Sequence, residues 1–517
     1  MSDTEIFDLL IIGGGVNGCG IARDAAGRGY SVYLAEKDDL AQATSSSSTK
    51  LFHGGLRYLE YFEFRLVKEA LRERDILLRN MPHISWPMRF VLPLHKDMRF
   101  DSTTPSSKLL GWVMPWMRGR RPNWLIRLGL FLYDAMAGWG SRLPKTRTIR
   151  LANTPEGVPL QDKYRKAFEY SDGWVEDSRL VVLNARDAAQ RGAQIETRTK
   201  VETATATNGI WTITLTDGRD GNTKTVKARM IVNAAGPWVG DVIHGRLRLK
   251  TNENTRLVRG SHLVVKRHYP HDKAYFFQGT DGRIIFAIPY EGDFTLIGTT
   301  DMAHHAPDQK PVCTPEEQDY LLNFANQYFE TPITKADIVW TYSGVRPLYD
   351  DGAQNASALT RDYVLKMNKT QDAPVLNIFG GKITTFRKLA ESALKLIDAE
   401  FGRPRPKWTA NAPLPGGDFA AFTRPKLIEK LRKKYTFLDE RTANRLITHY
   451  GTDAFKIFEG SDTPKKIAHG IYAPELDWVK VHEFVETADD FVWRRSRLGL
   501  HLTRDQIKKI DAYLAKG

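Results

Sequence analysis

The sequence predicts an α/β + α chain, in which an α/β unit carries an inserted second sheet and is followed by an all-helical C-terminal domain. Residues 8–36 place a short apolar run, a glycine-rich turn, a helical pattern and a second apolar run in succession. Two later segments, 229–243 and 377–391, again lead an apolar strand into a turn that contains glycine. After residue 402, a proline-rich linker is followed by apolar residues at helical spacing.

The composition is that of a globular protein with a basic surface. A chain of 517 residues is too long for one hydrophobic core, so two or three domains are expected. Apolar residues make up 42% and charged residues 26%, which excludes a disordered or collagen-like chain. The 75 basic and 61 acidic side chains give a formal charge of +14, which favours a phosphorylated substrate, acidic lipid or nucleic acid as partner. General solubility is the alternative explanation of this excess.

The cysteines and the N-terminal segment indicate a reducing compartment. Two cysteines, Cys19 and Cys313, cannot form a disulfide framework, and no Cys/His spacing suggests a metal site. The N-terminal segment is acidic, and its apolar run ends in glycines after about six residues, as in a buried strand rather than a signal peptide. No run of about 18 apolar residues is present, so no transmembrane helix is predicted.

The first turn of the chain is suited to a dinucleotide. It reads Gly13-x-Gly15-x-x-Gly18, lies between a predicted strand and helix, and is followed by Glu36 at the end of the second strand. Gly13 allows a tight turn, Gly15 lets the backbone approach a pyrophosphate, and Gly18 lets helix and strand pack closely. The helix N-terminus offers N–H donors to the phosphates, and Glu36 can accept from both ribose hydroxyls but would repel a 2′-phosphate. NAD or FAD is therefore expected rather than NADP.

The next stretch, 44–60, favours FAD over NAD. Its hydroxyl run, TSSSST, supplies donors for a ribityl-phosphate arm, and the glycine pair in HGGLRYLE offers flat backbone beside a flavin ring. A flexible linker is the alternative, but a linker is rarely followed at once by an ordered His-Gly-Gly-Leu-Arg-Tyr sequence. The cofactor contacts expected here are Thr44, Ser45, Ser46, Ser47, Lys50, His53, Gly54, Gly55 and Leu56.

Two further strand ends are expected to reach the same cofactor. The sequence RMIVNAAGPW resembles the second flavin-contacting strand of glutathione-reductase-like FAD folds, and NIFGGKITTF repeats the arrangement with threonines as helix caps. A helix N-terminus at the second of these could stabilise the anionic reduced ring. The contacts expected from the later segments are Val201, Ala235, Gly236, Trp238, Gly381, Lys382, Thr384 and Thr385.

Because three separated strand ends converge on one cofactor, the FAD-binding Rossmann domain is predicted to be discontinuous. The expected boundaries are 1–90, 150–245 and 345–400 for this domain, 91–149 for a basic aromatic segment, 246–344 for an inserted mixed-sheet substrate domain, and 401–517 for a C-terminal all-helical cap domain.

Several motifs together resemble one enzyme family. The FAD-dependent glycerol-3-phosphate dehydrogenases of the respiratory, aerobic type look similar to this chain in IIGGGVNGCGIARDAAGRG, TSSSSTKLFHGGLRYLE, RGSHLVV, IGTTD, YSGVRPL and FGGKITTFRKLAE. The resemblance covers residues 8–400 and continues more loosely through LPGGD and WRRSRLGL. It implies oxidation of sn-glycerol 3-phosphate to dihydroxyacetone phosphate by hydride transfer to FAD, with electrons passed to a membrane quinone. It also implies a peripheral, monotopic enzyme on the cytoplasmic face of the inner membrane.

Guanidinium groups are the expected ligands of a substrate phosphate, because their parallel N–H groups match phosphate oxygens. Arg57 and Arg346 are the two candidates, and Tyr58 adds a hydroxyl. A surface ion pair is the alternative role for each arginine.

Alcohol oxidation also needs a base that removes the O2 proton as the hydride leaves. His262 in RGSHLVV is the first candidate, because it resembles the family's active-site histidine; a structural role is the alternative. The resemblance leaves His53 open as a cofactor neighbour or a second base. Lys382 is expected to pair with the substrate oxygen or the flavin, unless it is simply an exposed lysine at a helix start, and residues 299–301 are expected to shape the pocket.

Residues 96–139 mix cations with tryptophans and long apolar side chains. Such a mixture is typical of an interfacial membrane element, in which tryptophan and leucine enter the headgroup boundary while lysine and arginine meet anionic lipid. The stretch 124–139 is too short to span a bilayer and contains Arg127 and Asp134. An amphipathic core helix beside a solvated basic loop is the alternative. An anionic membrane surface is therefore a predicted partner, and no quinone-site residue can be assigned.

Three other functions fit parts of the pattern. An oxidase that passes the same electrons to oxygen is separated poorly from the quinone-linked enzyme. An amine or amino-acid oxidase of related fold would need an apolar or carboxylate-binding pocket, which two convergent arginines count against. A basic protein that binds nucleic acid would need a nucleic-acid module, and none is present, so no nucleic acid is expected as partner. The sequence leaves a homo-oligomer open.

Overall fold

The structure is a computed structural model of the 517-residue chain. It describes residues 5–95, 112, 122–138, 143–279, 282–350, 362–370, 373–461 and 463–516, with the side chain of Arg57 excepted. All statements below concern these residues.

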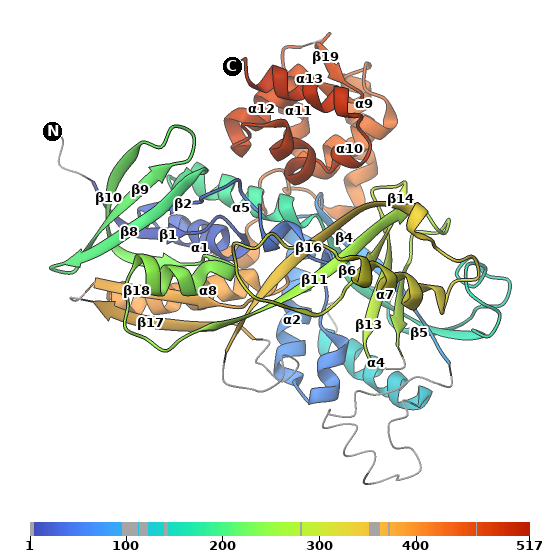
Figure 1. The fold of residues 1–517 in the computed structure, drawn as a ribbon. Helices are drawn as coiled ribbons and strands as arrows, with labels where there is room; N and C mark the ends of the chain where they lie inside the picture. Colours follow the sequence, from blue (N-terminus) through green and yellow to red (C-terminus); the bar gives the residue numbers. More distant parts are fainter. Residues whose placement is uncertain are drawn as a thin grey trace.

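An eight-stranded sheet forms one half of the molecule (Figure 1). The predicted strand–helix–strand unit is confirmed as β1 (Ile6–Ile12), α1 (Val16–Gly27) and β2 (Val32–Ala35). Strand β1 pairs in parallel with β2 and with β10 (Thr223–Asn233), and β10 pairs in parallel with β18 (Ala373–Phe379). Because parallel neighbours end at one edge of a sheet, the three predicted glycine turns meet there. The remaining strands are β7 (Gln194–Glu196), β8 (Thr199–Thr207), β9 (Ile210–Asp217) and β17 (Val364–Thr370).

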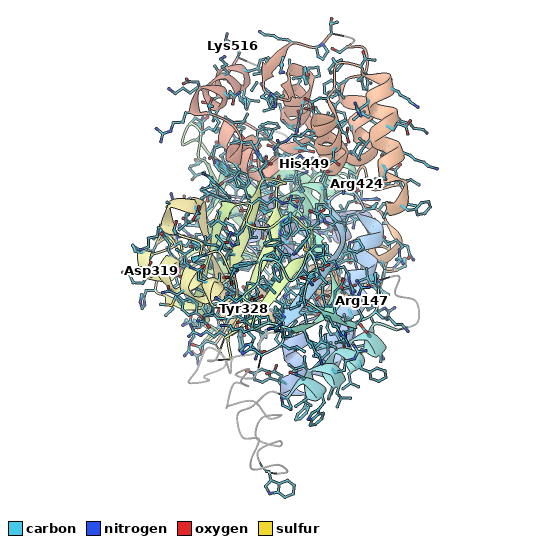
Figure 2. All side chains as sticks on the ribbon, turned by 90° about the vertical axis from the view of Figure 1, so that its right-hand side faces the viewer. Arg147, Asp319, Tyr328, Arg424, His449 and Lys516 are labelled. Atoms are coloured by element: carbon cyan, nitrogen blue, oxygen red, sulfur yellow. The ribbon has the colours of Figure 1, made fainter. Side chains whose placement is uncertain are left out.

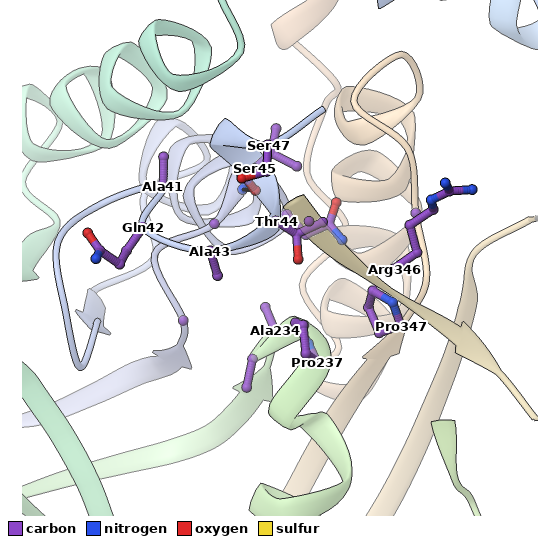
Figure 3. Close-up of a pocket in the computed structure, with 18 of the residues that line it drawn as sticks. Ala41, Gln42, Ala43, Thr44, Ser45, Ser47, Ala234, Pro237, Arg346 and Pro347 are labelled. Carbon is purple, nitrogen blue, oxygen red and sulfur yellow. Dashed lines mark hydrogen bonds between the residues drawn. The ribbon is translucent and has the colours of Figure 1, made fainter. Parts of the chain in front are cut away.

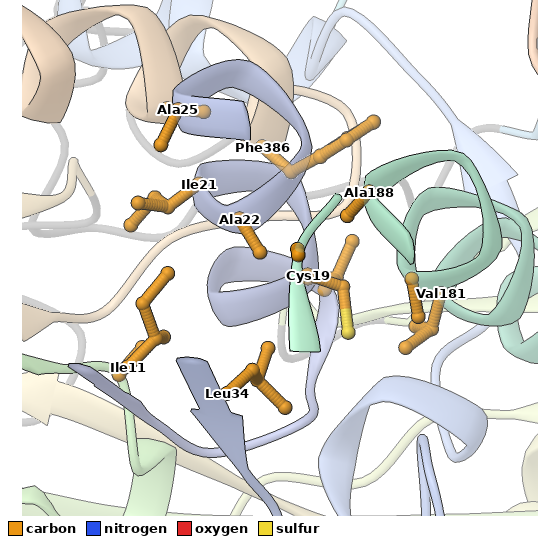
Figure 4. Packing of buried hydrophobic residues seen from close by; sticks show 14 of the residues in the cluster. Ile11, Cys19, Ile21, Ala22, Ala25, Leu34, Val181, Ala188 and Phe386 are labelled. Atoms are coloured by element: carbon orange, nitrogen blue, oxygen red, sulfur yellow. The ribbon is translucent and has the colours of Figure 1, made fainter. Parts of the chain in front are cut away.

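The core of this half surrounds α1. Figure 4 shows α1 between the sheet strands and the two helices α5 (Asp177–Gln190) and α8 (Phe386–Glu400). Small residues let the elements approach, since a Cβ added at Gly20 would lie 2.9 Å from a ring carbon of Phe386. Cys19 is fully buried in this core, and burial raises the pKa of its thiol, so it is an inert packing residue.

A ten-stranded mixed sheet forms the other half of the molecule. Its main path runs β15-β11-β14-β13-β12-β4-β6-β3, with β16 paired to β11 and β5 paired to β6. The helix α7 (Pro315–Asn326) packs on it. The strands are β3 (Leu51–Phe52), β4 (Ser85–Pro93), β5 (Arg147–Arg150), β6 (Lys166–Val175), β11 (Thr255–Lys266), β12 (Ala274–Gln278), β13 (Ile284–Tyr290), β14 (Phe294–Gly298), β15 (Met302–His304) and β16 (Ile338–Tyr349).

The predicted domain boundaries need correction at this sheet. Strands β3 to β6 lie in the segments expected to form the FAD-binding domain and the basic aromatic segment, yet they pair within the second sheet. The chain between β2 and β7 therefore contributes to both halves of the molecule, with β3 to β6 in the second sheet and α5 packed against α1. Local apolar patterns predict a strand but not its partner, because pairing is set by contacts distant in sequence.

The helices α2 (Phe64–Asn80) and α4 (Asn123–Ala137) pack together at the end of the molecule farthest from the C-terminal domain (Figure 1). Of the predicted membrane segment 96–139, the structure describes Trp112 and residues 122–138, and the other residues lie outside the described part. No helix among the described residues combines the length and apolarity that crossing a membrane requires.

The C-terminal domain sits above both halves. It contains α9 (Arg424–Lys434), α10 (Glu440–Tyr450), α11 (Ala454–Ile457), α12 (Ala473–Glu483) and α13 (Arg504–Leu514). The all-helical prediction is wrong in one detail, because β19 (Lys466–Ala468) and β20 (Ile471–Tyr472) form a short hairpin. Figure 2 shows Arg424 and His449 on the underside of this domain, where it meets the rest of the chain.

Candidate active site

A cavity of about 750 Å³ lies between the two sheets, at the edge where β1, β10 and β18 end. Figure 3 shows the turn at 41–47 facing Ala234 and Pro237 across this cavity, with Arg346 and Pro347 of β16 at one end. Gly13, Gly236 and Gly381 all line it, so the predicted convergence of three strand ends on one site is confirmed.

The glycine turn is shaped for close backbone approach. Gly13 has φ +109°, and a Cβ there would lie 2.6 Å from the carbonyl oxygen of Ala234. A Cβ at Gly18 would lie 2.0 Å from the oxygen of Gly13, which confirms Gly18 as the packing glycine of helix and strand. Gly15 lines the cavity immediately before α1, as expected for a backbone that meets a phosphate.

Glu36 occupies its predicted place at the end of β2 and lines the cavity. Its carboxylate accepts from the N–H of Gly14 at 2.6 Å and from the N–H of Asp38 at 2.9 Å. Burial raises the pKa of Glu36 to about 7 despite these two donors. The carboxylate is therefore fixed by the backbone at the position where a ribose would lie.

The hydroxyl run forms a turn around the cavity, but only part of it faces inward. Among its predicted contacts, Thr44, Ser45 and Ser47 line the cavity. Ser46 and Lys50 are absent from the lining, because the fully buried Lys50 ammonium donates to the Ser46 carbonyl at 3.1 Å and to Asp177 at 2.8 Å. These two residues stabilise the turn on its side away from the cavity.

The glycine pair does not lie flat along the cavity. His53 lines it, whereas Gly54, Gly55 and Leu56 do not. Gly54 donates its N–H to the Tyr133 hydroxyl at 2.8 Å, and a Cβ there would lie 2.5 Å from a methyl carbon of Leu71. The pair therefore serves the packing of α2 and α4, and Gly55, with φ +71°, starts the next turn.

The later segments contribute most of their predicted residues to the cavity. Those in the lining are Val201, Ala235, Gly236, Trp238, Gly381, Lys382 and Thr384, while Thr385 is buried beneath the start of α8.

Two cavity residues at the outer edge were missed by the sequence reading. Lys37 places its ammonium 3.7 Å from the centre of the Trp238 ring, and the indole N–H of Trp238 donates to Asp308 at 2.6 Å. All three residues line the cavity, so a lysine, a tryptophan and an aspartate from three segments close its edge. No sequence motif marks Asp308, which lies in an irregular loop.

His262 lies on β11 in the inner wall and is 2% exposed. Its Nε2 lies 2.9 Å from the Thr49 hydroxyl, its ring stacks on Tyr342 at 4.7 Å, and its Nδ1 has no hydrogen-bond partner in the described part of the chain. Burial, with the charges of Lys50 and Arg346, lowers the pKa of His262 to about 3. The imidazole is therefore neutral at neutral pH.

Arg346 lies on β16 with its side chain 42% exposed. One guanidinium nitrogen pairs with Asp301 at 2.8 Å, and the other donates to the Thr300 carbonyl at 3.2 Å. That second nitrogen also packs on Gly260, where an added Cβ would lie 2.6 Å from it. The orientation of the guanidinium is thus fixed by Asp301, by the Thr300 carbonyl and by its packing on Gly260.

Lys382, Tyr58 and His53 also line the cavity, and His53 directly follows β3 of the second sheet. The Lys382 ammonium lies 4.0 Å from the centre of the Tyr58 ring, and burial, together with this lysine, lowers the pKa of His53 to about 4. The side chain of Arg57, the other predicted phosphate ligand, lies outside the described part of the chain.

Comparison with known proteins decides the family. A family model described as FAD dependent oxidoreductase matches residues 8–369, and one described as the C-terminal domain of alpha-glycerophosphate oxidase matches residues 407–515. The chain belongs to the FAD-dependent oxidoreductases. Its cofactor is FAD.

Relatives of this FAD-dependent oxidoreductase match it over nearly its whole length. D-erythritol 1-phosphate dehydrogenase of Brucella abortus is 46% identical over 97% of this chain and 96% of its own. Glycerol-3-phosphate dehydrogenase of Pseudomonas aeruginosa is 44% identical over 99% and 95%, and aerobic glycerol-3-phosphate dehydrogenase of Escherichia coli is 41% identical over 99% and 98%. The solved glycerol-3-phosphate dehydrogenase of Bacillus halodurans, complexed with FAD, has a TM-score of 0.72 and 27% identity, covering 99% and 94%.

The residues of this FAD-dependent oxidoreductase fit FAD. Gly13 and Gly18, where an added Cβ would collide with backbone, make the turn tight, and Gly15 brings backbone to the cavity where a pyrophosphate would lie. The fixed Glu36 carboxylate suits a ribose, and the hydroxyls of Thr44, Ser45 and Ser47 suit the linking arm. The same cavity is lined both by Glu36 and by His262.

Proposed function

We propose that this FAD-dependent oxidoreductase oxidises sn-glycerol 3-phosphate to dihydroxyacetone phosphate and passes the electrons to a membrane quinone. The observation that carries the proposal is the pairing of an exposed guanidinium, Arg346, with a buried neutral imidazole, His262, in the wall of one cavity. FAD supplies the hydride acceptor. The protein's residues bind the substrate, orient its C2 and manage the proton on its O2.

Arg346 is the proposed phosphate ligand. Its fork is held in place by Asp301 and the Thr300 carbonyl, and its remaining N–H groups can meet a phosphate dianion. Arg57 is the second proposed ligand, with Tyr58 as a hydroxyl donor. Lys382 is proposed to orient the substrate oxygen or the flavin, because it lines the same cavity.

His262 is the proposed base. Burial keeps its imidazole neutral, as a group that accepts a proton must be. Because the charge of Arg346 is one cause of the lowered pKa, neutralising that arginine with a phosphate would move the pKa of His262 toward its ordinary value. Substrate binding would then prepare the base that the reaction needs.

A neighbouring polyol phosphate is a second candidate substrate, because the relative at 46% identity is named for D-erythritol 1-phosphate. Both compounds present a phosphate and a secondary alcohol, so the same arginine and histidine would serve. The discriminating contacts would lie where the chain carbons beyond C2 meet the cavity wall.

The apolar face of α4 supports the proposed membrane partner. Trp124, Leu128, Phe131 and Leu132 are exposed there, while Ile126, Leu130 and Tyr133 face the protein. Phe62 and Phe64, at the start of the adjoining α2, are also exposed. An apolar helix face that lies flat in an anionic bilayer on its cytoplasmic side would bring the enzyme to a quinone.

The test is an anaerobic absorbance scan of the purified holoenzyme before and after addition of each polyol phosphate. Bleaching of the oxidised flavin band by glycerol 3-phosphate at the lower concentration supports the proposal. Preferential bleaching by D-erythritol 1-phosphate transfers it to the second substrate, and bleaching only by amines or amino acids overturns it. Reoxidation by a quinone analogue in vesicles, compared with oxygen, decides the acceptor.

A further inference from the structure

We propose that Arg497, from the C-terminal domain, is a positioning residue of the active site. It holds the turn at 44–49 and, through Asp177 and Lys50, the surroundings of His262. The inference rests on the proposed function, because it concerns the proposed base. It gives the C-terminal domain a part in the chemistry, although that domain does not line the cofactor cavity.

Two cations from different domains share the same acceptors beneath the turn. Arg497 is 4% exposed, and one of its terminal nitrogens donates to the Ser46 carbonyl at 2.9 Å and to Asp177 at 3.0 Å. Lys50 is fully buried and donates to the same carbonyl at 3.1 Å and to the same carboxylate at 2.8 Å. Asp177 lies at the start of α5 and is 1% exposed, so water cannot replace either cation.

A chain of contacts leads from this carboxylate to the proposed base. The Ser48 hydroxyl donates to Asp177 at 2.8 Å, and the Tyr342 hydroxyl donates to the Ser48 carbonyl at 2.9 Å. The Tyr342 ring stacks on His262 with an angle of 12° between the ring planes. Thr49, next to Ser48, places its hydroxyl 2.9 Å from the histidine Nε2. The carboxylate therefore fixes both the ring beneath the imidazole and the hydroxyl beside it.

The backbone at both cations is unusual. Lys50 has φ +61° and Arg497 has φ +55°, in the left-handed region that residues with a Cβ rarely adopt. Such a conformation persists where the surroundings over-determine it, and here both residues donate to Asp177. Although burial disfavours a charged Asp177, Lys50 and Arg497 hold the pKa of this carboxyl below its ordinary value. The carboxylate is thus a permanent anion between two fixed cations.

The neighbouring Arg495 provides a matched control. It is 1% exposed and comes from the same segment, but it donates to Asp39 and to the Glu483 carbonyl rather than to the turn. Loss of Arg495 therefore removes hydrogen bonds between the C-terminal domain and Asp39 without removing a bond to Ser46 or Asp177.

The experiment compares Arg497→Met, Arg497→Lys and Arg495→Met as full-length holoenzymes. For Arg497→Met we expect the rate of anaerobic flavin reduction by glycerol 3-phosphate to fall about ten-fold or more, with KM changed less than three-fold. Arg497→Lys, which keeps a charge and donors, should recover most of that rate. Equal losses for Arg497→Met and Arg495→Met, or a normal rate in Arg497→Met, would overturn the proposal.

Two further measurements keep the proposal open to refutation. If Arg497→Met does not fold, Tyr342→Phe removes only the hydroxyl that reaches Ser48, and a normal reduction rate in that variant refutes the chain of contacts. Visible circular dichroism of the bound flavin needs no substrate. A changed spectrum in Arg497→Met or Tyr342→Phe, but not in Arg497→Lys or Arg495→Met, supports the positioning role even if neither polyol phosphate is oxidised, and unchanged spectra in Arg497→Met and Tyr342→Phe count against it.

Discussion

Gly260→Ala should damage substrate binding more than it damages the fold. Gly260 lies on β11 beneath the guanidinium of Arg346, and an added Cβ would lie 2.6 Å from the nearer terminal nitrogen and 2.7 Å from the Thr299 hydroxyl. Carbon and nitrogen pack without strain at about 3.5 Å, so the guanidinium must move by about 1 Å. The Arg346 nitrogen is the end of a long side chain and moves at little cost, whereas the Thr299 hydroxyl and the Thr300 carbonyl oxygen, which is 3.1 Å from the added Cβ, must also give way.

The same shift is costly for a phosphate ligand. It breaks the 3.2 Å hydrogen bond to the Thr300 carbonyl and turns the fork away from its line to the substrate. Loss or misalignment of one charge-assisted hydrogen bond costs about 1.5–3 kcal/mol, which corresponds to a rise of about 10- to 150-fold in KM for glycerol 3-phosphate. The melting temperature should fall only modestly, because the lower entropy of the unfolded chain with alanine partly offsets the contacts with Thr299 and the Thr300 carbonyl.

The assay is steady-state kinetics with a quinone analogue, together with flavin content and melting temperature. Gly245→Ala is the matched control, because an added Cβ there meets nothing within 4 Å. A KM within two-fold of wild type in a Gly260→Ala enzyme of normal flavin content would refute Arg346 as the phosphate ligand.

Three further outcomes are expected. Phe131→Asp on the exposed face of α4 should lower binding to anionic liposomes at least five-fold in a sedimentation assay. Val481→Asp, also exposed but on the C-terminal domain, should not lower it. Equal binding of the two variants would mean that another surface meets the membrane. Asp308→Ala should speed FAD dissociation about three- to ten-fold, measured by the recovery of flavin fluorescence, because it removes the acceptor of the Trp238 indole N–H. Asp319→Ala, which removes an exposed ion pair, should leave the dissociation rate unchanged. Equal dissociation rates in the two variants would show that Asp308 does not help to retain FAD. Burial lowers the pKa of His83 to about 3, so below pH 6.5 the unfolded chain binds a proton that the folded chain does not, and the free energy of unfolding decreases as the pH is lowered. His83→Gln should remove about 1.5 kcal/mol of this decrease between pH 6.5 and 5, measured by urea titration. An unchanged pH dependence of the unfolding free energy would contradict the burial of a neutral ring.

The parts of the fold that the sequence predicted are those set by local geometry. The turn at Gly13 follows from steric limits that only glycine meets, and it predicts the strand before it and the helix after it. Gly236 and Gly381 reach the same cavity because β10 and β18 are parallel neighbours of β1 or of each other, which makes their ends coincide.

The parts that escaped prediction depend on distant partners. The glycine pair at Gly54 looks like flavin-facing backbone in the sequence, but it is required by Leu71 and Tyr133 of α2 and α4. Lys50 lies in a motif rich in cofactor contacts, yet its partner Asp177 is on another helix and turns it away from the cavity. No local pattern reveals that Arg497 reaches the same carboxylate from the far end of the chain.

The order of strands in the first sheet has a consequence for biosynthesis. About 140 residues, including β11 to β16, are translated after β10 and before its parallel neighbour β18. At about 5–20 residues per second the ribosome needs roughly 7–30 s for that interval, during which residues 231–233 of β10, beyond the stretch paired with β9, have no partner on one side. The wall formed by Gly381 and Thr384 does not yet exist on the nascent chain. FAD capture is therefore a late step, and a nascent chain that stalls before β18 leaves the backbone at the C-terminal end of β10 open to pairing with other chains.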